Sequence, residues 1–150
     1  MAVRRKRARL VLDTSVLAAA FLARDRRSPN LHLYRMWGER RIQLIVTDEL
    51  EEEYLGVLAG LGASATHRQR FAQRLRTRST VSWVRPDRAF RLSRDPSDDF
   101  LLSVAVAGQA EFLVTNDRDL LSIPAQDLRG YGFRIVTAAD ALTLLRTHRP

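Results

Sequence analysis

Short apolar runs alternate with helical patterns along the whole chain, and this alternation restricts the fold more than any other feature. The expected strands are residues 10–12, 43–46, 81–84, 112–115 and 133–136. Helices are expected at about residues 16–23, 29–39, 48–60, 66–77, 96–109 and 138–145. Strands that alternate with helices predict an α/β domain, in which a parallel sheet is covered by helices on both faces.

The length and the composition fit one such domain. A chain of 150 residues with 45% hydrophobic residues suits a single core, and we expect a basic arm at residues 1–8 and a folded domain at residues 9–147. The absence of cysteine excludes disulfides and a cysteine-based zinc site. No apolar run approaches the roughly 18 residues of a membrane span, and Asp13 interrupts the run behind the basic start. We therefore expect a cytoplasmic protein without a membrane partner.

The chain is strongly basic, and its cations are almost all arginine. Lys and Arg total 25 against 17 Asp and Glu, which gives a net charge of +8. Arginine binds phosphate groups in a bidentate geometry, so a polyanion such as nucleic acid is the expected partner. A basic surface that only aids solubility, or that reflects a GC-rich coding bias, is the alternative at this stage.

Two of the expected strands end near an acid. Residues 10–12 lead directly into Asp13, and residues 112–115 lead through Asn116 to Asp117. In an open parallel sheet, ligands bind outside the carboxyl ends of the strands, where the strand order reverses. We therefore predict that Asp13 and Asp117 form half of a metal site.

Two further acids fall within the apolar stripes of expected helices. Glu53 falls within the apolar stripe of the helix expected at residues 48–60. Asp98 falls within the apolar stripe of the helix expected at residues 96–109, and Asp99 lies at the side of that stripe. The stripes consist of residues at helical spacing, which are Leu50, Tyr54, Val57, Leu58 and Leu61 in one helix and Leu101, Leu102, Ala105 and Gln109 in the other. A carboxylate on a buried face is costly unless it is paired or binds a metal. Glu53 and Asp98 are therefore predicted to complete the site.

Each acid also has a structural explanation. Asp13 or Asp117 could cap the helix that follows it. Asp98 could stabilise a first helical turn that Asp95 caps, and Glu53 could pair with an arginine. Carboxylates gathered at one place repel one another unless a cation is present. Mg²⁺ and Mn²⁺ prefer oxygen ligands and can activate water for phosphodiester cleavage, so they are the metals we expect.

These residues and their order resemble the PIN-domain family. The resemblance is to prokaryotic members that are toxin components of toxin–antitoxin systems and, more distantly, to the VapC ribonucleases. It covers about residues 9–145. The matching segments are residues 10–17, 46–54, 95–105, 112–121 and 134–140.

The resemblance implies a single domain with a five-stranded parallel sheet and an endoribonuclease activity that depends on Mg²⁺ or Mn²⁺. It also implies RNA as the substrate, frequent homodimers and an antitoxin protein as a partner. The implied catalytic and metal-binding acids are Asp13, Glu53, Asp98 and Asp117.

Residues next to these acids have implied auxiliary roles. They are Thr14, Ser15, Asp99, Thr115 and Asn116. The family usually has an acid and then an Asn around the third site, whereas this chain has Ser97 and Asp99 there, so Asp98 and Asp99 both remain candidates for the third ligand. Arg94 and Arg118 lie beside the acids in the sequence and are our candidates for contacts with substrate phosphates.

Other functions fit the chain less well. A non-catalytic nucleic-acid-binding or regulatory PIN-like protein would keep the fold without turnover, although all four acids are present. A haloacid-dehalogenase-type phosphatase needs Asp-x-Asp after its first strand, but Thr14 and Ser15 follow Asp13. A phospho-aspartate receiver needs a lysine at a late strand exit, but the only lysine is Lys6. We therefore predict a metal-dependent ribonuclease.

Overall fold

Five parallel strands form one sheet in the computed structural model of the chain, which describes residues 6–87, 89–93 and 95–147. The order of the strands in the sheet is β3-β2-β1-β4-β5. Their bounds are β1 (Ala8–Leu12), β2 (Ile42–Val46), β3 (Val81–Trp83), β4 (Phe112–Val114) and β5 (Arg134–Val136). The predicted α/β fold with a five-stranded parallel sheet is confirmed.

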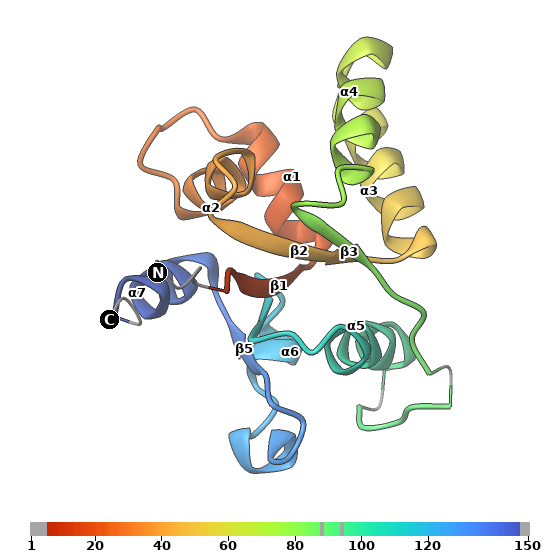
Figure 1. The fold of residues 1–150 in the computed structure, drawn as a ribbon, viewed down its shortest axis with the longest axis vertical. Coiled ribbons are helices and arrows are strands. Elements are labelled where there is room, and N and C mark those ends of the chain that lie inside the picture. The colour runs from red at the N-terminus through yellow and green to blue at the C-terminus, as the bar shows by residue number, and fades with distance from the viewer. Residues whose placement is uncertain (1–5, 88, 94, 148–150) are drawn as a thin grey trace, which may run out of the picture.

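Helices cover both faces of this sheet. Figure 1 shows α1 and α2 on one side of the strands and α5 on the other side. The helices of the described residues are α1 (Thr14–Leu22), α2 (Pro29–Gly38), α3 (Asp48–Gly60), α4 (Ala65–Leu75), α5 (Pro96–Ala107), α6 (Arg118–Leu121), the 3₁₀ helix η1 (Ala125–Leu128) and α7 (Ala138–Thr147). The helix α6 is the short helix that the capping explanation for Asp117 required. The 3₁₀ helix η1 was not among the expected elements, because four residues are too few to show a helical period.

Side chains at the helix starts explain why several predicted boundaries agree with the structure. Ser28 precedes α2, and its side chain accepts a hydrogen bond from the backbone N–H of Leu31 over 3.4 Å. Thr47 precedes α3 and accepts in the same way from the N–H of Leu50 over 3.0 Å. Each cap satisfies a backbone N–H that has no partner within its own helix.

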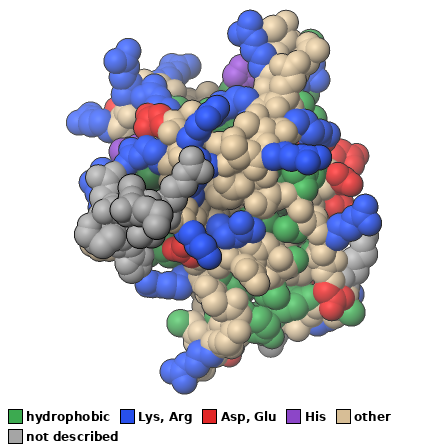
Figure 2. All heavy atoms as spheres, viewed as in Figure 1, with side chains coloured by type: hydrophobic (Ala, Val, Ile, Leu, Met, Phe, Trp, Pro, Cys, Tyr) green, Lys and Arg blue, Asp and Glu red, His purple; other side chains and the backbone are tan. Residues whose placement is uncertain are grey.

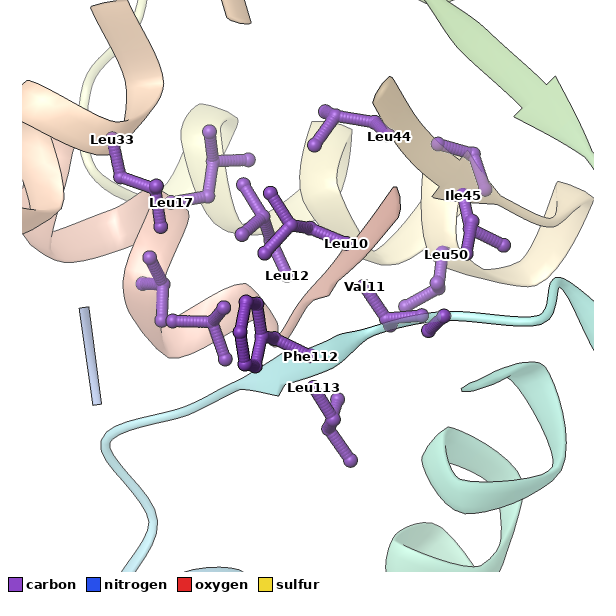
Figure 3. Close-up of a cluster of buried hydrophobic side chains, with 14 of the residues drawn as sticks. Leu10, Val11, Leu12, Leu17, Leu33, Leu44, Ile45, Leu50, Phe112 and Leu113 are labelled. Carbon is purple, nitrogen blue, oxygen red and sulfur yellow. The ribbon is translucent and has the colours of Figure 1, made fainter. Parts of the chain in front are cut away.

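The apolar runs at residues 10–12 and 112–114 are strand segments that are buried on both faces. Leu10 and Leu113 have no exposed surface. Figure 3 shows Leu10 beside Leu17 and Leu33, on the side of α1 and α2, while Leu113 points to the opposite side of the sheet. Because both faces of a parallel sheet are covered, its strands are continuously apolar rather than alternating.

The strand order places the carboxyl ends of β1 and β4 side by side. The chain starts at the central β1, builds outward through β2 to β3, and then returns to the other side of β1 as β4. Leu12 pairs with Val114 at the ends of the two strands. The reversal between β1 and β4 is the switch point at which α/β sheets bind ligands.

The N-terminal arm that we predicted at residues 1–8 is only partly within the described residues. Residues 1–5 lie outside them, and Ala8 is the first residue of β1. Arg7 donates a hydrogen bond to the backbone oxygen of Ser79. In the part of the chain that the structure describes, none of the helices combines the length and the apolar character that a membrane crossing needs.

Candidate active site

The four predicted acids line one cavity at the carboxyl ends of β1 and β4. Its volume is about 530 Å³. Asp13 follows β1, Glu53 lies on α3, Asp98 lies in the first turn of α5, and Asp117 precedes α6. No Lys or Arg is among the described residues that line this cavity. The sheet and its helices thus bring together acids that are more than 100 residues apart in the chain, and the described lining residues supply no positive charge between them.

Asp13 is held by hydroxyl groups and does not cap the helix that follows it. Its Oδ2 accepts hydrogen bonds from Ser15 Oγ over 3.2 Å and from Thr115 Oγ1 over 2.7 Å. Its side chain makes no capping bond to α1, so the structural explanation that the sequence left open for this residue is wrong. Among the described residues, none donates a hydrogen bond to Asp13 Oδ1. One carboxylate oxygen is therefore fixed in place and the other is available.

The same hydroxyls join the ends of β1 and β4. Thr115 is fully buried, and its Oγ1 also accepts a hydrogen bond from the backbone N–H of Asp117 over 2.9 Å. Ser15 Oγ accepts a hydrogen bond from the backbone N–H of Asn116 over 3.2 Å. Three of the predicted auxiliary residues, Ser15, Thr115 and Asn116, thus orient the two strand-end acids.

Thr14, the fourth predicted auxiliary residue, lies beside this network but is not part of it. Its side chain is buried, and Oγ1 has no hydrogen-bond partner among the described residues. It is also not among the residues that line the acidic cavity.

Asp117 both caps a helix and lines the cavity. Its Oδ1 accepts a hydrogen bond from the backbone N–H of Asp119 over 2.9 Å, which caps α6. The side chain is exposed. The capping explanation is therefore correct for Asp117, and it does not remove the carboxylate from the cavity.

Asp98 is the most buried of the four acids, with 6% of its surface exposed. Burial, followed by the negative charges of nearby acids, raises the pKa of its carboxyl to about 6; these acids are Asp95, Asp117, Asp119 and Asp13. A raised carboxyl pKa is the expected result of desolvation and like-charge repulsion. The prediction of a buried acid at Asp98 is confirmed.

Glu53 lines the cavity, but the prediction that it lies on a buried face is wrong. Its side chain is exposed, and it forms no ion pair with any described residue. The buried stripe of α3 consists of Leu50, Tyr54 and Leu58. Successive helical residues are about 100° apart, so Glu53 lies about a quarter turn from Tyr54, at the side of that stripe.

Asp99 does not join the acidic cavity. It is 3% exposed, and its Oδ1 accepts hydrogen bonds from the backbone N–H groups of Leu92 and Ser93 over 2.7 and 2.5 Å. These bonds fix the segment before α5. Between the two candidates for the third ligand, the structure brings only Asp98 into the cavity.

Arg118, one of the two arginines that we predicted to contact phosphate, is not among the described residues that line the cavity. Arg118 is exposed at the start of α6. Arg94 lies outside the described residues, so its predicted role stays a prediction.

Two residues near the site were missed as functional candidates. Asp95 lines the cavity, and its side chain also caps α5 through the backbone N–H of Ser97. Tyr54 is buried, and its hydroxyl donates a hydrogen bond to the backbone oxygen of Leu12, directly before Asp13. Burial and the charges of Asp13 and Glu53 raise the pKa of the Tyr54 hydroxyl. The acid at residue 95 was visible in the sequence, but the contact of Tyr54 with Leu12 was not.

The acids share the cavity without converging on one point. Within the described residues, no three His, Cys, Asp or Glu side chains are placed to hold a metal ion together. The donor set nevertheless fits a hydrated divalent cation, because Mg²⁺ usually keeps several waters and takes only one or two carboxylates directly. Such a cation would offset the repulsion that raises the pKa of Asp98.

The chain is thus an α/β domain with an all-parallel sheet and with acids at the switch point of that sheet. The family model of the PIN domain matches residues 9–119, which contain all four acids, and the chain belongs to this family. The predicted family is thereby confirmed. PIN domains are generally nucleases that bind nucleic acid and typically use divalent metals. The comparison with curated proteins gave no match.

Proposed function

We propose that this PIN domain is a metal-dependent endoribonuclease that hydrolyses phosphodiester bonds of RNA. The observation that carries the proposal is the cavity shared by Asp13, Glu53, Asp98 and Asp117. Oxygen ligands of this kind suit Mg²⁺ or Mn²⁺. A bound cation would activate water and stabilise the leaving oxygen.

The four acids have different environments, and we assign different roles to them. Asp13, Asp98 and Asp117 hold the metal, directly or through water. Asp13 offers Oδ1 for this purpose, because Ser15 and Thr115 occupy its Oδ2. Glu53 is exposed and has no ion-pair partner among the described residues, so it is suited to orient the attacking water or to complete the metal's ligand shell.

The positive charge of the chain supports a polyanionic substrate. In Figure 2, Lys and Arg side chains are scattered over much of the visible face, in keeping with the net charge of +8. Contacts between such side chains and phosphates supply affinity without reading sequence. We assign phosphate contacts to Arg118, next to Asp117, and to Arg94 on its sequence position alone.

We further propose that the chain is the cytoplasmic toxin of a toxin–antitoxin pair and forms a homodimer. This part rests on the sequence resemblance. Expression of the active chain should arrest growth of a bacterial host, and coexpression of the protein encoded beside it should restore growth. Light scattering on the purified chain measures the dimer.

The test is cleavage of a labelled single-stranded RNA by the purified chain, with a DNA of the same sequence in parallel. We expect internal cleavage of the RNA with Mg²⁺ or Mn²⁺, and no cleavage in EDTA or with Asp13→Asn. Asp127→Asn is the matched control, because Asp127 is exposed and does not line the cavity. Cleavage that persists in EDTA or in Asp13→Asn would contradict the assignment, since it would come from another nuclease.

A non-catalytic PIN protein that binds nucleic acid is the second candidate. The observation that favours it is the absence, within the described residues, of three groups placed to hold a metal. Calorimetric titration with Mn²⁺ separates the two. Binding that is lost in Asp13→Asn supports the ribonuclease, and RNA binding without any Mn²⁺ binding supports the second candidate.

A further inference from the structure

A second cavity, of about 200 Å³, lies against the acidic cavity. Pro96 and Phe100 line both of them. We propose that this second cavity binds a base of the RNA next to the cleaved bond, and that Asp99 selects bases that present N–H donors. The inference rests on the proposed ribonuclease function and adds to it the place where the sequence of the substrate is read.

The size and the walls of the cavity suit a single planar ring system. Whole-ligand pockets are typically about 300–1,000 Å³, so 200 Å³ fits a part of a nucleotide. Phe90 and Phe100 are half-buried in its wall. Phe90 is held edge-to-face against Tyr131, with ring centroids 5.6 Å apart. Proteins that read single-stranded RNA stack its bases on aromatic side chains of this kind.

Part of the wall of this cavity comes from α5. Figure 2 shows hydrophobic side chains gathered at the lower right, where Figure 1 places α5. Stacking of a base would cover such a surface, whereas a phosphate group would not.

Asp99 gives the cavity a hydrogen-bond acceptor that lacks a donor. Its Oδ1 already accepts two backbone N–H groups, from Leu92 and Ser93. Its Oδ2 accepts from no described residue, although Asp99 is 3% exposed and lines the cavity. This carboxylate oxygen can therefore accept an N–H group from the edge of a base.

Ser103 adds a second acceptor to the same wall. Its hydroxyl donates to the backbone oxygen of Phe100 over 2.6 Å, so the lone pairs of its oxygen remain for a ligand. Guanine presents two adjacent N–H donors and suits such a pair of acceptors. Uracil presents one N–H between two carbonyl oxygens, which a carboxylate repels. We therefore expect guanine to bind best and uracil to bind worst.

The two cavities also lie in the right relation for one substrate. Asp98 and Asp99 are consecutive residues in the first turn of α5, and each lines a different cavity. Because the cavities share Pro96 and Phe100, a base in one leaves the neighbouring phosphate at the acids of the other.

The experiment measures binding of guanosine and uridine to the full chain by NMR titration in EDTA. Nucleosides carry no phosphate, so neither metal nor catalysis affects the result. We expect guanosine to bind at least about tenfold more tightly than uridine. Phe90→Leu should weaken guanosine binding by about five- to 150-fold through lost stacking. Phe21→Ala is the control, because Phe21 is a half-buried aromatic residue that lines neither cavity, and it should change nothing.

The Asp99→Asn variant tests the proposed base preference most directly. The amide oxygen can still accept from Leu92 and Ser93, while the carboxylate oxygen Oδ2 is replaced by an NH₂ donor. The preference for guanosine over uridine should therefore fall by at least about tenfold. Equal binding of both nucleosides to the unmodified chain, or an unchanged preference in a folded Asp99→Asn variant, would overturn the proposal. Selective guanosine binding by a chain that cleaves no RNA would leave this site standing and refute the ribonuclease function.

Discussion

The two ends of the parallel strands, which we call the carboxyl edge and the amino edge of the sheet, carry opposite charges. At the carboxyl edge, five aspartate and glutamate residues line a cavity that has no Lys or Arg among its described lining residues. At the amino edge, a larger cavity of about 580 Å³ is lined by Lys6, Arg7, Arg41 and Arg146, with Glu111 as its only acid among the described residues. The larger cavity lies at the edge where α/β sheets rarely bind ligands. The position of a cavity at the switch point of the sheet and the clustering of acids in its wall therefore identify the candidate site better than the volume of the cavity does.

The charged side chains at the two edges also differ in whether they contact groups that stabilise their charge. At the amino edge, Arg9 Nε donates to the backbone oxygen of Gly108 over 2.8 Å, at the end of α5. A cation stabilises the C-terminal end of a helix. At the carboxyl edge, burial and then the repulsion of the neighbouring acids raise the pKa of Asp98. The amino edge thus contributes stability, whereas the carboxyl edge reduces it, as functional sites often do.

The largest expected effect follows from Asp98→Asn. Loss of this carboxylate should reduce RNA cleavage by more than about 100-fold, because it removes a proposed metal ligand. In EDTA the same variant should be more stable than the unmodified chain by about 1–3 kcal/mol at pH 7. Urea denaturation of both proteins between pH 4 and pH 8 measures this difference.

The pH dependence of that stability has a defined sign. The pKa of Asp98 is about 6 in the folded chain and about 3.9 when unfolded. A raised folded pKa means that stability is fully present below about pH 4 and is lost as the pH rises through 6. Asp98→Asn should remove this loss, and Asp127→Asn should keep it. Equal slopes of the unfolding free energy against pH in all three proteins would show that the charge of Asp98 does not destabilise the folded chain.

The next effect tests the hydroxyl that joins the two strand-end acids. Thr115→Val keeps the shape of the side chain and removes the hydrogen bonds to Asp13 and Asp117. We expect cleavage to fall by about 10- to 100-fold, because groups that orient metal ligands have effects of this size. Thr143→Val is the control, since Thr143 is exposed on α7. Similar cleavage rates for the two variants would mean that Asp13 needs no orienting partner.

A smaller effect concerns the packing of α5 at the amino edge. A Cβ atom on Gly108 would lie 2.4 Å from Ile45 Cγ2. Gly108→Ala should therefore lower the free energy of unfolding by about 1–3 kcal/mol through overpacking. Gly56→Ala meets nothing within 4 Å and should raise it by about 0.5–1 kcal/mol. Thermal denaturation measures both, and a neutral Gly108→Ala would mean that α5 can shift away from β2.

The smallest effect is expected from the cations of the amino edge. Arg41→Ala combined with Arg146→Ala should change the free energy of unfolding by less than about 0.5 kcal/mol, and kcat by less than about twofold. RNA affinity should fall slightly and depend less on salt. Steady-state cleavage at two salt concentrations checks this. A tenfold loss of kcat would show that residues of the amino edge contribute to catalysis, which would contradict the difference in function that we infer between the two edges.

The sequence predicted the sheet because its physical signal is local. The central strands are buried on both faces near their carboxyl ends, so the apolar runs at residues 10–12 and 112–115 stand out from their polar surroundings. Ser28 and Thr47 mark helix starts through bonds to residues only three positions away. The strand-end acids followed from the same local pattern and from the rule that ligands bind at carboxyl ends.

What the sequence could not supply depends on contacts between distant residues or on fine helical geometry. Helical spacing placed Glu53 within the apolar stripe, but α3 buries the face centred on Tyr54, and Glu53 lies at its side. The bonds from Asp99 to Leu92 and Ser93 depend on the path of an irregular segment, which no periodicity predicts.

The hydrogen bond between Asp13 and Thr115 joins residues 102 positions apart. A ribosome adds about 5–20 residues per second, so about 5–20 s separate the synthesis of the two residues. During that interval β1 has no β4 beside it, and the acidic cavity has no second half. The ribonuclease that we propose would thus lack its complete active site during this interval, while it is attached to a machine made largely of RNA, and the site could form only after Asp117 has been added.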